Sequence, residues 1–449
     1  MLDFNTFKLT VMARAKELEV SEYELYYRVS ESTNVETFKH EIKEFSDSRE
    51  GGVCFRCIVD GKMGYASTEE MSESQAVSIV DRAVENAKIL EADEKVFLGK
   101  GGEDYEALTV TPYELPAVQE MTDTALEGDR LLYEADSAVI DGSAAGVICS
   151  KEFIAISNSN GLDLSYENNV AVFVAASVVT DGTDMANSYE IKSGDFSGLD
   201  IEKIVSKVVG NAKSKLSAGV APTGSYPVVF SPDAMASLLA TFSGIFSSEN
   251  TQKGLSLLDG KEGEKIASDI VTLVDDPFCK DSTMPINFDA EGSPTHTKNV
   301  IENGVLKTLL YNLKTADAVG KKTTGNASKS SYAAKVDISP FTMYLAPGDM
   351  TEEELLKKAA NGVYITFLGG LHAGANPITG DFSLQSGGFM IENGEKTKAV
   401  KSFTVAGNFY SLLNRITALS DKVELPGFGG MTAFGSPAVL VEGLTIAGK

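Results

Sequence analysis

The chain contains few of the side chains that hold transition metals in hydrolases. Three of its 449 residues are histidines, His40, His296 and His372, and they lie far apart in the sequence. A catalytic zinc site needs two or three His, Cys or carboxylate ligands at the spacing of a helix or a strand, with a base beside an open coordination position. The chain offers no histidine pair of this kind. His40, in a strand-like segment, and His296, in a turn-like segment, have polar neighbours and are expected to face solvent.

Cysteine is scarce as well, with four residues in the chain. Cys54 and Cys57 form a nominal CxxC within GGVCFRCIVDGKMGYAS, whose Val, Phe and Ile content and Asp60-Gly61 turn are typical of a β-hairpin. Side chains three residues apart on a strand point to opposite faces of the sheet. Cys149 and Cys279 supply no second pair. We therefore expect neither a zinc ribbon nor a disulfide.

Long hydrophobic runs are also missing. No stretch approaches the roughly 18 consecutive apolar residues of a membrane-spanning helix. The segment MLDFNTFKLTVMARAKELEV has charges where a secretion signal would have its apolar centre. These absences predict a cytoplasmic protein that does not bind a membrane. The chain is 43% hydrophobic and 23% charged, which is ordinary for a globular protein, and it is long enough for two or three domains.

Basic residues are outnumbered by acidic ones. The chain has 39 Lys and Arg residues against 64 Asp and Glu residues, which gives a net charge of −25. A surface of this sign repels phosphate backbones, and no stripe of Lys and Arg with interleaved aromatic residues counteracts the repulsion. We therefore expect no direct contact with nucleic acid.

Several motifs of common enzyme classes are absent. The sequence has no GxSxG nucleophile elbow, no P-loop and no GxGxxG after a strand, and GGMTAFG at 429–435 lacks the required spacing. Asp275 and Asp276 are adjacent carboxylates, but neighbouring residues on a strand point in opposite directions. We expect this pair to cap a turn or hairpin rather than to share a proton in catalysis.

Signals for helices and strands are clear in the first half of the chain. Helices are expected at about 7–18, 73–91, 113–132 and 201–216, and strands through YELYYRV, VETFKH, GGVCFRCIV and the long stretch from Ala144 to Val179. Ser72 and Gln75 form a capping box for the second helix. The Gly- and Pro-containing stretch SAGVAPTGSYPVV predicts a domain boundary. Residues 1–222 would form an N-terminal α+β domain and residues 223–449 a C-terminal, strand-rich α+β domain.

The second half begins with the strand PVVF and a helix. Ser231 is its predicted N-cap, Pro232 lies in the first turn, and Asp233 lies beside the positive end of the helix dipole. Apolar residues from Met235 to Phe246 fall on one broad face, and no ionisable residue occurs between Asp233 and Glu249. This helix is expected to be buried.

Further along, two short motifs predict hairpins and one predicts a helix. Asn303-Gly304 and Asn393-Gly394, each within IENG, predict two-residue hairpin turns. Thr351 and Glu354 form a capping box for a short helix, and another helix is expected over 409–419. Helices that are segregated from hairpin-rich segments predict an α+β fold with mainly antiparallel sheets and helices packed on them.

Several of these stretches, in order, resemble one protein family. They are FSDSREGGVCFRCIVDGKMGYASTEEMSESQAVSIVDRAVENA, GLSLLDGKEGEKIASDIVTLVDDP, NVIENGVLKTLLYNLKTADAVGKKTTGNASKSSY, GGLHAGANPITGDFSLQSGGFMIENGE and VAGNFYSLLNRITALSDKVELPGFGGMTAFGSPAVLVEGLTIAG. Together they are similar to the TldD/PmbA family, whose members were once labelled modulators of DNA gyrase and are now regarded as subunits of a cytosolic metallopeptidase. The resemblance covers most of the chain.

The family has two branches, and the resemblance implies which one applies. In the TldD branch, a helix carries HExxxH, with two zinc-binding histidines and a glutamate base, and a late cysteine completes the site. Counted back from Gly254, the matching positions in this chain run from Leu239 and Ala240 to Gly244, without a His or Glu. The late position falls in PGFGGM at 426–431, which has no Cys. The chain thus resembles the PmbA branch, also called TldE, which implies that it has no catalytic residue, metal or cofactor of its own.

The resemblance also implies a function and partners. The chain would be a non-catalytic subunit that pairs with a TldD-like, zinc-bearing subunit, and the pair would degrade or trim peptides and unfolded segments. Without that partner a homodimer is expected. His372, Asn376 and Asp381 in the Gly- and Pro-bent loop GGLHAGANPITGDFSL, together with Glu249, are predicted to shape a cleft or a subunit contact.

Two alternatives stay open at this point. One is a protein-binding regulator without a proteolytic role, which acts on a toxin, an antitoxin or DNA gyrase. The other is a self-sufficient hydrolase with an unrecognised metal site around Asp275, Asp276, Glu249 and His372.

Overall fold

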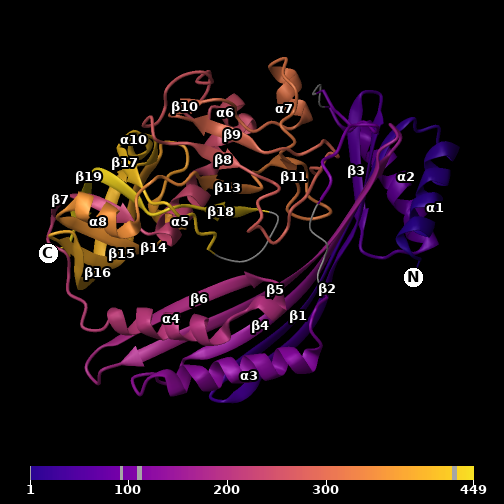
Figure 1. Cartoon of the computed structure of the whole chain (residues 1–449). Helices are drawn as coiled ribbons and strands as arrows, with labels where there is room; N and C mark the ends of the chain where they lie inside the picture. The colour runs from indigo at the N-terminus through magenta and orange to yellow at the C-terminus, as the bar shows by residue number, and fades with distance from the viewer. Residues whose placement is uncertain (1, 92–94, 109–113, 427–431, 449) are drawn as a thin grey trace.

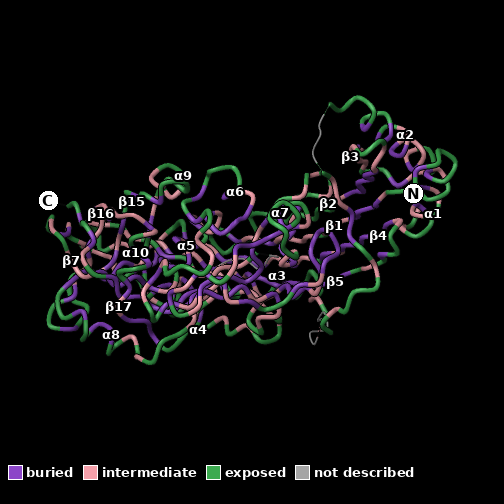
Figure 2. Tube along the Cα trace, turned by 90° about the horizontal axis from the view of Figure 1, so that it is seen from above, coloured by how far each residue is buried: buried purple, intermediate pink, exposed green. Residues whose placement is uncertain are grey.

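The fold was analysed in a computed structural model, which describes residues 2–91, 95–108, 114–426 and 432–448 (Figure 1). The molecule is elongated, with the N-terminus at one end and the C-terminus at the other (Figures 1 and 2). The sheets are mainly antiparallel and the helices lie outside them, which confirms the predicted α+β class. None of the helices in the described ranges is long and apolar enough to cross a membrane.

The N-terminal part is built on one six-stranded sheet in the order β3-β2-β1-β4-β5-β6. Every neighbouring pair in this sheet is antiparallel. Its strands are β1 (Glu22–Phe38), β2 (Glu41–Val59), β3 (Lys62–Thr68), β4 (Ala144–Asn158), β5 (Asp163–Thr180) and β6 (Met185–Gly194). The helices of this part are α1 (Phe4–Glu17), α2 (Glu73–Ile89), α3 (Val118–Ala135) and α4 (Ile201–Ser214), with a 3₁₀ turn η1 (Phe196–Gly198) before α4.

The two faces of this sheet have different neighbours. On one face, α1 and α2 cover one end of the strands and α3 and α4 cover the other end (Figure 1). The opposite face packs against the C-terminal half, where Tyr26 and Ile154 join Phe288 and Phe341 in one hydrophobic cluster. Alternate residues of β1 therefore belong to different cores, because side chains on a strand alternate between faces.

Most of the C-terminal half is arranged around a second six-stranded sheet, in the order β16-β15-β14-β7-β19-β17. An additional pairing of β16 with β19 closes five of these strands into a barrel. The strands are β7 (Gly224–Phe230), β14 (Gly362–Gly369), β15 (Asp381–Glu392), β16 (Glu395–Asn408), β17 (Ile416–Leu419) and β19 (Val439–Ala447). Only β7 and β14 run parallel within this sheet, among the pairings between described residues.

A third sheet and several short helices lie between the barrel and the N-terminal sheet (Figure 1). Its strand order is β10-β9-β8-β13-β18, and β11 pairs with β12 beside it. These strands are β8 (Leu273–Asp275), β9 (Lys298–Glu302), β10 (Val305–Leu306), β11 (Ala327–Ser328), β12 (Asp337–Ile338), β13 (Thr342–Leu345) and β18 (Ala433–Gly435). The remaining helices are α5 (Pro232–Phe242), η2 (Ser243–Phe246), α6 (Ser248–Gln252), α7 (Leu313–Ala318), α8 (Glu352–Ala359), α9 (Leu371–Gly374) and α10 (Phe409–Asn414).

Most of the turn and cap predictions agree with the structure. Of the capping box predicted at α2, one half is formed among the described residues, with Ser72 accepting the N–H of Gln75. Asn303 and Asn393 have φ of 49° and 53°, and each is followed by a glycine with positive φ in a hairpin turn, β9–β10 or β15–β16. Ser231 caps α5 by accepting a hydrogen bond from the N–H of Ala234. Thr351 and Glu354 form the complete capping box of α8. These signals succeed because each depends only on neighbouring residues.

Three local predictions differ from the structure. The helix expected over 409–419 ends at Asn414, because the following residues pair with β19 as strand β17. The helix expected from residue 113 begins at Val118, after Pro116, and residue 113 itself lies outside the described ranges. His40 is not in a strand: it lies in the β1–β2 turn with a φ of 65°. It is exposed, as is His296. The division of the chain at residues 222 and 223 stays a prediction.

Candidate functional site

The positions predicted to match the zinc motif of the catalytic branch, Leu239, Ala240 and Gly244, lie in α5 and in the 3₁₀ turn η2 that follows it. Leu239 is buried in the main hydrophobic core of the C-terminal half, Ala240 exposes only a methyl group, and Gly244 has no side chain. The helix ends at Phe242, whose ring stacks on Phe409 with centroids 4.6 Å apart. Neither Leu239, Ala240 nor Gly244 has a side chain that can donate an electron pair to zinc, so this part of α5 and η2 does not fit the metal.

The backbone after α5 is held by polar contacts that do not need a metal. Gly244 accepts a hydrogen bond from Asn250 Nδ2 at 2.8 Å, and Ser256 Oγ donates to the carbonyl of Ile245 at 2.7 Å. A side chain at position 244 would lie 3.3 Å from Asn250 Nδ2. The late cysteine position was predicted to fall within residues 426–431. Of these, residues 427–431 lie outside the described part of the chain. Within the described ranges, no group of three or more His, Cys, Asp or Glu residues is arranged to hold a metal.

The four residues of the alternative hydrolase site do not form such a group. Asp275 is fully buried and accepts hydrogen bonds from Asn326 Nδ2 at 2.8 Å and from the N–H of Phe341 at 2.8 Å, and it pairs with Lys298 Nζ at 3.1 Å. Asp276 accepts from the N–H of Phe278 and from Thr297 Oγ1. Both carboxylates therefore serve the local structure, each with hydrogen-bond partners of its own.

The loop that contains His372 lies on the surface. His372 is in the single-turn helix α9, which contacts α5, and its side chain is exposed. Asn376 Oδ1 accepts hydrogen bonds from the N–H groups of Ile378 and Thr379, which folds the loop into a turn. Asn408 Nδ2 donates to Asp381 at 2.9 Å and lowers the pKa of that carboxyl group. Asn376 and Asp381 thus shape the loop, whereas their role in a cleft or subunit contact, with His372, stays a prediction.

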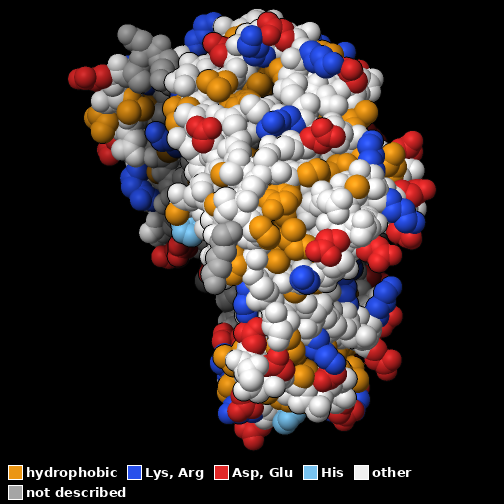
Figure 3. Space-filling model, turned by 90° about the vertical axis from the view of Figure 1, so that its left-hand side faces the viewer, with side chains coloured by type: hydrophobic (Ala, Val, Ile, Leu, Met, Phe, Trp, Pro, Cys, Tyr) orange, Lys and Arg blue, Asp and Glu red, His pale blue; other side chains and the backbone are white. Residues whose placement is uncertain are grey.

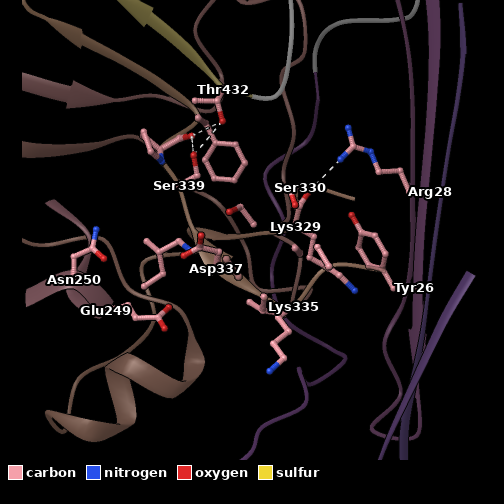
Figure 4. A pocket seen from close by; sticks show the side chains of 18 of the residues that line it. Tyr26, Arg28, Glu249, Asn250, Lys329, Ser330, Lys335, Asp337, Ser339 and Thr432 are labelled. Atoms are coloured by element: carbon pink, nitrogen blue, oxygen red, sulfur yellow. Dashed lines mark hydrogen bonds between the residues drawn. The ribbon is translucent and has the colours of Figure 1, made fainter. Parts of the chain in front are cut away.

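The fourth predicted residue, Glu249, lines a cleft of about 840 Å³ between the N-terminal sheet and the C-terminal half (Figure 4). Tyr26 and Arg28 of β1 line one side, and Glu249 and Asn250 of α6 line the other. The loop from β11 to β12 contributes Lys329, Ser330 and Lys335. Ser339 and Thr432 also line the cleft, and their hydroxyl groups form a hydrogen bond of 3.1 Å with each other. A volume of this size is typical of sites for small molecules or short peptide segments.

A buried charge cluster supports the wall of this cleft. Asp289 accepts three backbone N–H groups, including that of Ala327 at 2.9 Å, and so holds β11 in place. Glu291 accepts the N–H of Leu313 at 2.8 Å. Burial raises the pKa of both carboxyl groups. Behind them, Arg56 Nε of β2 donates to Glu24 Oε1 of β1 at 2.7 Å, and both side chains are buried.

Apart from Glu249, the residues that line this cleft were not predicted from the sequence. Its lining comes from residue 26 to residue 432, and neither Tyr26 nor Arg28 belongs to a recognisable motif. The one available signal was the stretch NASKSSY, which carries Lys329 and lies within the family-like segments. On the described part of the face at the barrel end of the molecule, Lys and Arg are interspersed with Asp and Glu, without a continuous basic stripe (Figure 3).

Three family models match the chain. They are described as PmbA/TldA metallopeptidase domain 1, central domain and C-terminal domain, and they match residues 23–87, 112–216 and 223–448. An uncharacterised protein of Methanocaldococcus jannaschii is 29% identical over 97% of this chain and 99% of its own length.

Two solved structures share the fold over nearly the whole length. A protein of Thermotoga maritima described as a candidate modulator of a DNA gyrase has a TM-score of 0.90 and 30% identity, and the match covers 99% of this chain and 100% of that one. TldE of Thermococcus kodakarensis has a TM-score of 0.88 and 26% identity, with 99% of both chains covered.

Proposed function

The chain belongs to the PmbA/TldD metallopeptidase family, and from this premise we propose that it is the zinc-less, non-catalytic subunit of a two-subunit cytoplasmic peptidase. The observation that carries the proposal is the composition of α5 and η2 at Leu239, Ala240 and Gly244, where the resemblance implies that the catalytic branch needs two histidines and a glutamate. A structural neighbour that bears the name TldE, the zinc-less branch, supports the same assignment.

In this arrangement the partner is a TldD-like subunit that retains HExxxH, and its zinc supplies the activated water for peptide hydrolysis. This chain contributes the wall of the reaction chamber and a surface that holds substrate. The substrate would be a peptide or an unfolded segment, because only an extended chain can enter a chamber enclosed by two subunits. In the absence of the partner we expect this chain to form a homodimer.

One edge of the N-terminal sheet supports substrate holding through the main chain. Strand β3 pairs with β2 only from Val53 to Val59, so the segment from Glu41 to Gly52 pairs with β1 on one side and with no other described strand on the other. Its residues up to Glu50 are exposed. An extended peptide can add to such an edge by backbone hydrogen bonds. The charged side chains along the segment limit pairing with other copies of the chain.

The proposal is tested by purifying this chain, its HExxxH-bearing relative from the same genome, and the two together. Zinc per chain and cleavage of an unfolded peptide are measured for each sample. We expect zinc only in the relative, co-purification of the two chains, and full cleavage only by the pair. A variant of the relative whose motif glutamate is replaced by glutamine serves as a control, because the pair should form but should not cleave. Stoichiometric zinc and cleavage in this chain alone would refute the assignment.

The same measurements separate the two alternatives. A regulator without a proteolytic role would leave cleavage by the relative unchanged when this chain is added. The name of the Thermotoga maritima neighbour is the observation that keeps DNA gyrase among its possible targets. The hydrolase built on Asp275, Asp276, Glu249 and His372 would cleave without a partner. Asp275 is already bound to Lys298, Asn326 and the Phe341 backbone, which speaks against it.

A further inference from the structure

The cleft between β1 and the β11–β12 loop contains a buried cation. Lys329 is 7% exposed and lines the cleft. Its Nζ lies 4.4 Å from the centroid of the Tyr26 ring, and among the described residues no carboxylate is close enough to form an ion pair with it. An ammonium group is strongly hydrated in water, and an aromatic face replaces only part of that hydration. Burial accordingly lowers the pKa of Lys329.

The other charges of the cleft do not neutralise Lys329. Its charged lining residues are Arg28, Glu249, Lys253, Lys329, Lys335 and Asp337. Glu249 Oε1 pairs with Lys253 Nζ at 2.5 Å, and Arg28 pairs with Glu152. Asp337 accepts the N–H of Ile338 at 2.8 Å. Lys335 is exposed and has no acidic partner among the described residues. The side chains that line the cleft therefore carry more positive than negative charges, in a chain whose net charge is −25.

Neutral donors face the same space. The Tyr26 hydroxyl has no hydrogen-bond partner among the described residues, and Ser328 of β11 and Ser330 of the following loop add hydroxyl groups. Arg28 Nη1 donates to the carbonyl of Lys329 at 3.2 Å and so fixes the backbone of this loop (Figure 4). A cationic anchor with hydroxyl donors around it suits a small anion with two acceptor oxygens.

We propose that this cleft is a carboxylate-binding subsite for an extended peptide, with Lys329 as the buried anchor and Lys335 at the entrance. The identity of the ligand as a peptide rests on the proposed function, whereas its carboxylate group is inferred from the charges of the cleft. The carboxylate belongs either to the C-terminus of the peptide or to an Asp or Glu side chain. The net negative charge of the chain repels acidic peptides from the rest of its surface. Such peptides would thus be guided to this cleft.

The test measures binding of fluorescein-labelled, unstructured peptides to the full-length chain by fluorescence anisotropy. One peptide pair differs only in a free or amidated C-terminus, and a second pair only in Glu or Gln at an internal position. A hydrogen bond to a charged group in a buried site supports a preference of about tenfold for the acidic member. The pair that shows this preference identifies the source of the carboxylate. Equal affinities within both pairs would overturn the proposal, without the need for any variant.

Variants assign the preference to the cleft. Lys329→Met keeps the length of the side chain and removes its charge, and it is expected to abolish the preference. Lys329→Arg is expected to retain part of it, and Lys335→Met, at an exposed position, to reduce it less than Lys329→Met. Lys16→Met removes one exposed charge from α1, away from the cleft, and should leave the preference intact. A preference that survives both Lys329→Met and Lys335→Met, in folded protein, would contradict the assignment.

The outcome of this test can be told apart from the outcome of the test of the proposed function. Cleavage by the pair without any carboxylate preference would leave the subunit role standing and remove the subsite. A carboxylate preference in a chain that never supports cleavage would leave the subsite standing and remove the subunit role.

Discussion

At the scale of single residues, Asp275 shows why an ionisable group in this protein is not by itself a sign of catalysis. Its two carboxylate oxygens accept hydrogen bonds from Lys298 Nζ, Asn326 Nδ2 and the N–H of Phe341, and the residue has no exposed surface. Removing one member of a buried ion pair leaves the other charge without compensation. The residue therefore contributes to stability, although its sequence context also suggested a carboxylate pair with Asp276.

We expect Asp275→Asn to lower the free energy of unfolding by about 3–5 kcal/mol, because Lys298 stays buried without a counter-charge. Urea denaturation followed by circular dichroism measures the change. Glu353→Gln removes one partner of the exposed Glu353–Lys357 pair and should give no measurable change. Adding Lys298→Met to Asp275→Asn should recover part of the loss. An Asp275→Asn protein as stable as the parent would show that the buried ion pair makes no net contribution to the free energy of unfolding.

The cysteines give a second example at this scale. On β2, Cys57 packs with Phe55 beneath α1 and α2, whereas Cys54 lies on the other face, so the two thiols do not converge. All four cysteines are free. Burial raises the pKa of Cys57 and of Cys149 to about 11. Both thiols therefore stay protonated and unreactive near neutral pH.

At the scale of elements, α5 is a helix formed by its cap and its apolar face, without a side chain that could hold a metal at Leu239 or Ala240. Its start is set by Ser231 and Pro232, and its apolar residues belong to the core of the C-terminal half. The helix thus serves packing, since most helical stability in proteins comes from the burial of an apolar face.

The cap of α5 provides a test. Ser231→Ala removes the acceptor for the N–H of Ala234 and is expected to lower the free energy of unfolding by about 1 kcal/mol, whereas Ser231→Asp retains an acceptor and should cost less. Ser237→Ala, in the same helix, is the matched control. Its hydroxyl bonds only to the carbonyl of Asp233 one turn earlier, so its removal should be close to neutral. Equal losses at residues 231 and 237 would contradict a capping role.

Strand β17 is an element that could not be predicted from the local sequence. The segment from Phe409 to Leu419 predicts one helix, but Ile416 pairs with Val441 of β19 and starts strand β17. Local propensity is a weak preference, and a partner strand that is distant in the sequence overrides it. The turns at Asn303 and Asn393 were predictable because the left-handed conformation they need is a property of the residues themselves.

At the scale of the whole molecule, a buried charge cluster connects the two halves of the chain. Arg56 and Glu24 belong to the N-terminal sheet, while Glu291 lies in the C-terminal half and accepts the first N–H of α7. Burial, together with the nearby Asp289, raises the pKa of Glu291. Because the pKa of Glu291 is higher in the folded state than in the unfolded state, its contribution to stability is fully present below the unfolded pKa of about 4.3. That contribution is lost as the pH rises through the pKa of the folded state.

We therefore expect Glu291→Gln to gain stability relative to the parent as the pH rises from 5 to 8, since the variant has no carboxyl group to ionise. Urea unfolding of both proteins at several pH values measures the difference. Glu70→Gln, at an exposed position, should give a difference that does not depend on pH. A difference between Glu291→Gln and the parent that falls with pH would show that Glu291 is held as an anion by Arg56.

The sequence by itself determined the features that depend on which residues are present and on their immediate neighbours. These are the α+β class, the hairpin turns, the helix caps and the absence of metal ligands at Leu239, Ala240 and Gly244, because a missing imidazole cannot be supplied by folding. The tertiary structure alone decided that Tyr26, Lys329 and Thr432 line one cleft. Only the packing of β1 against the C-terminal half brings these residues together, and contacts over such separations leave no periodic pattern in the sequence.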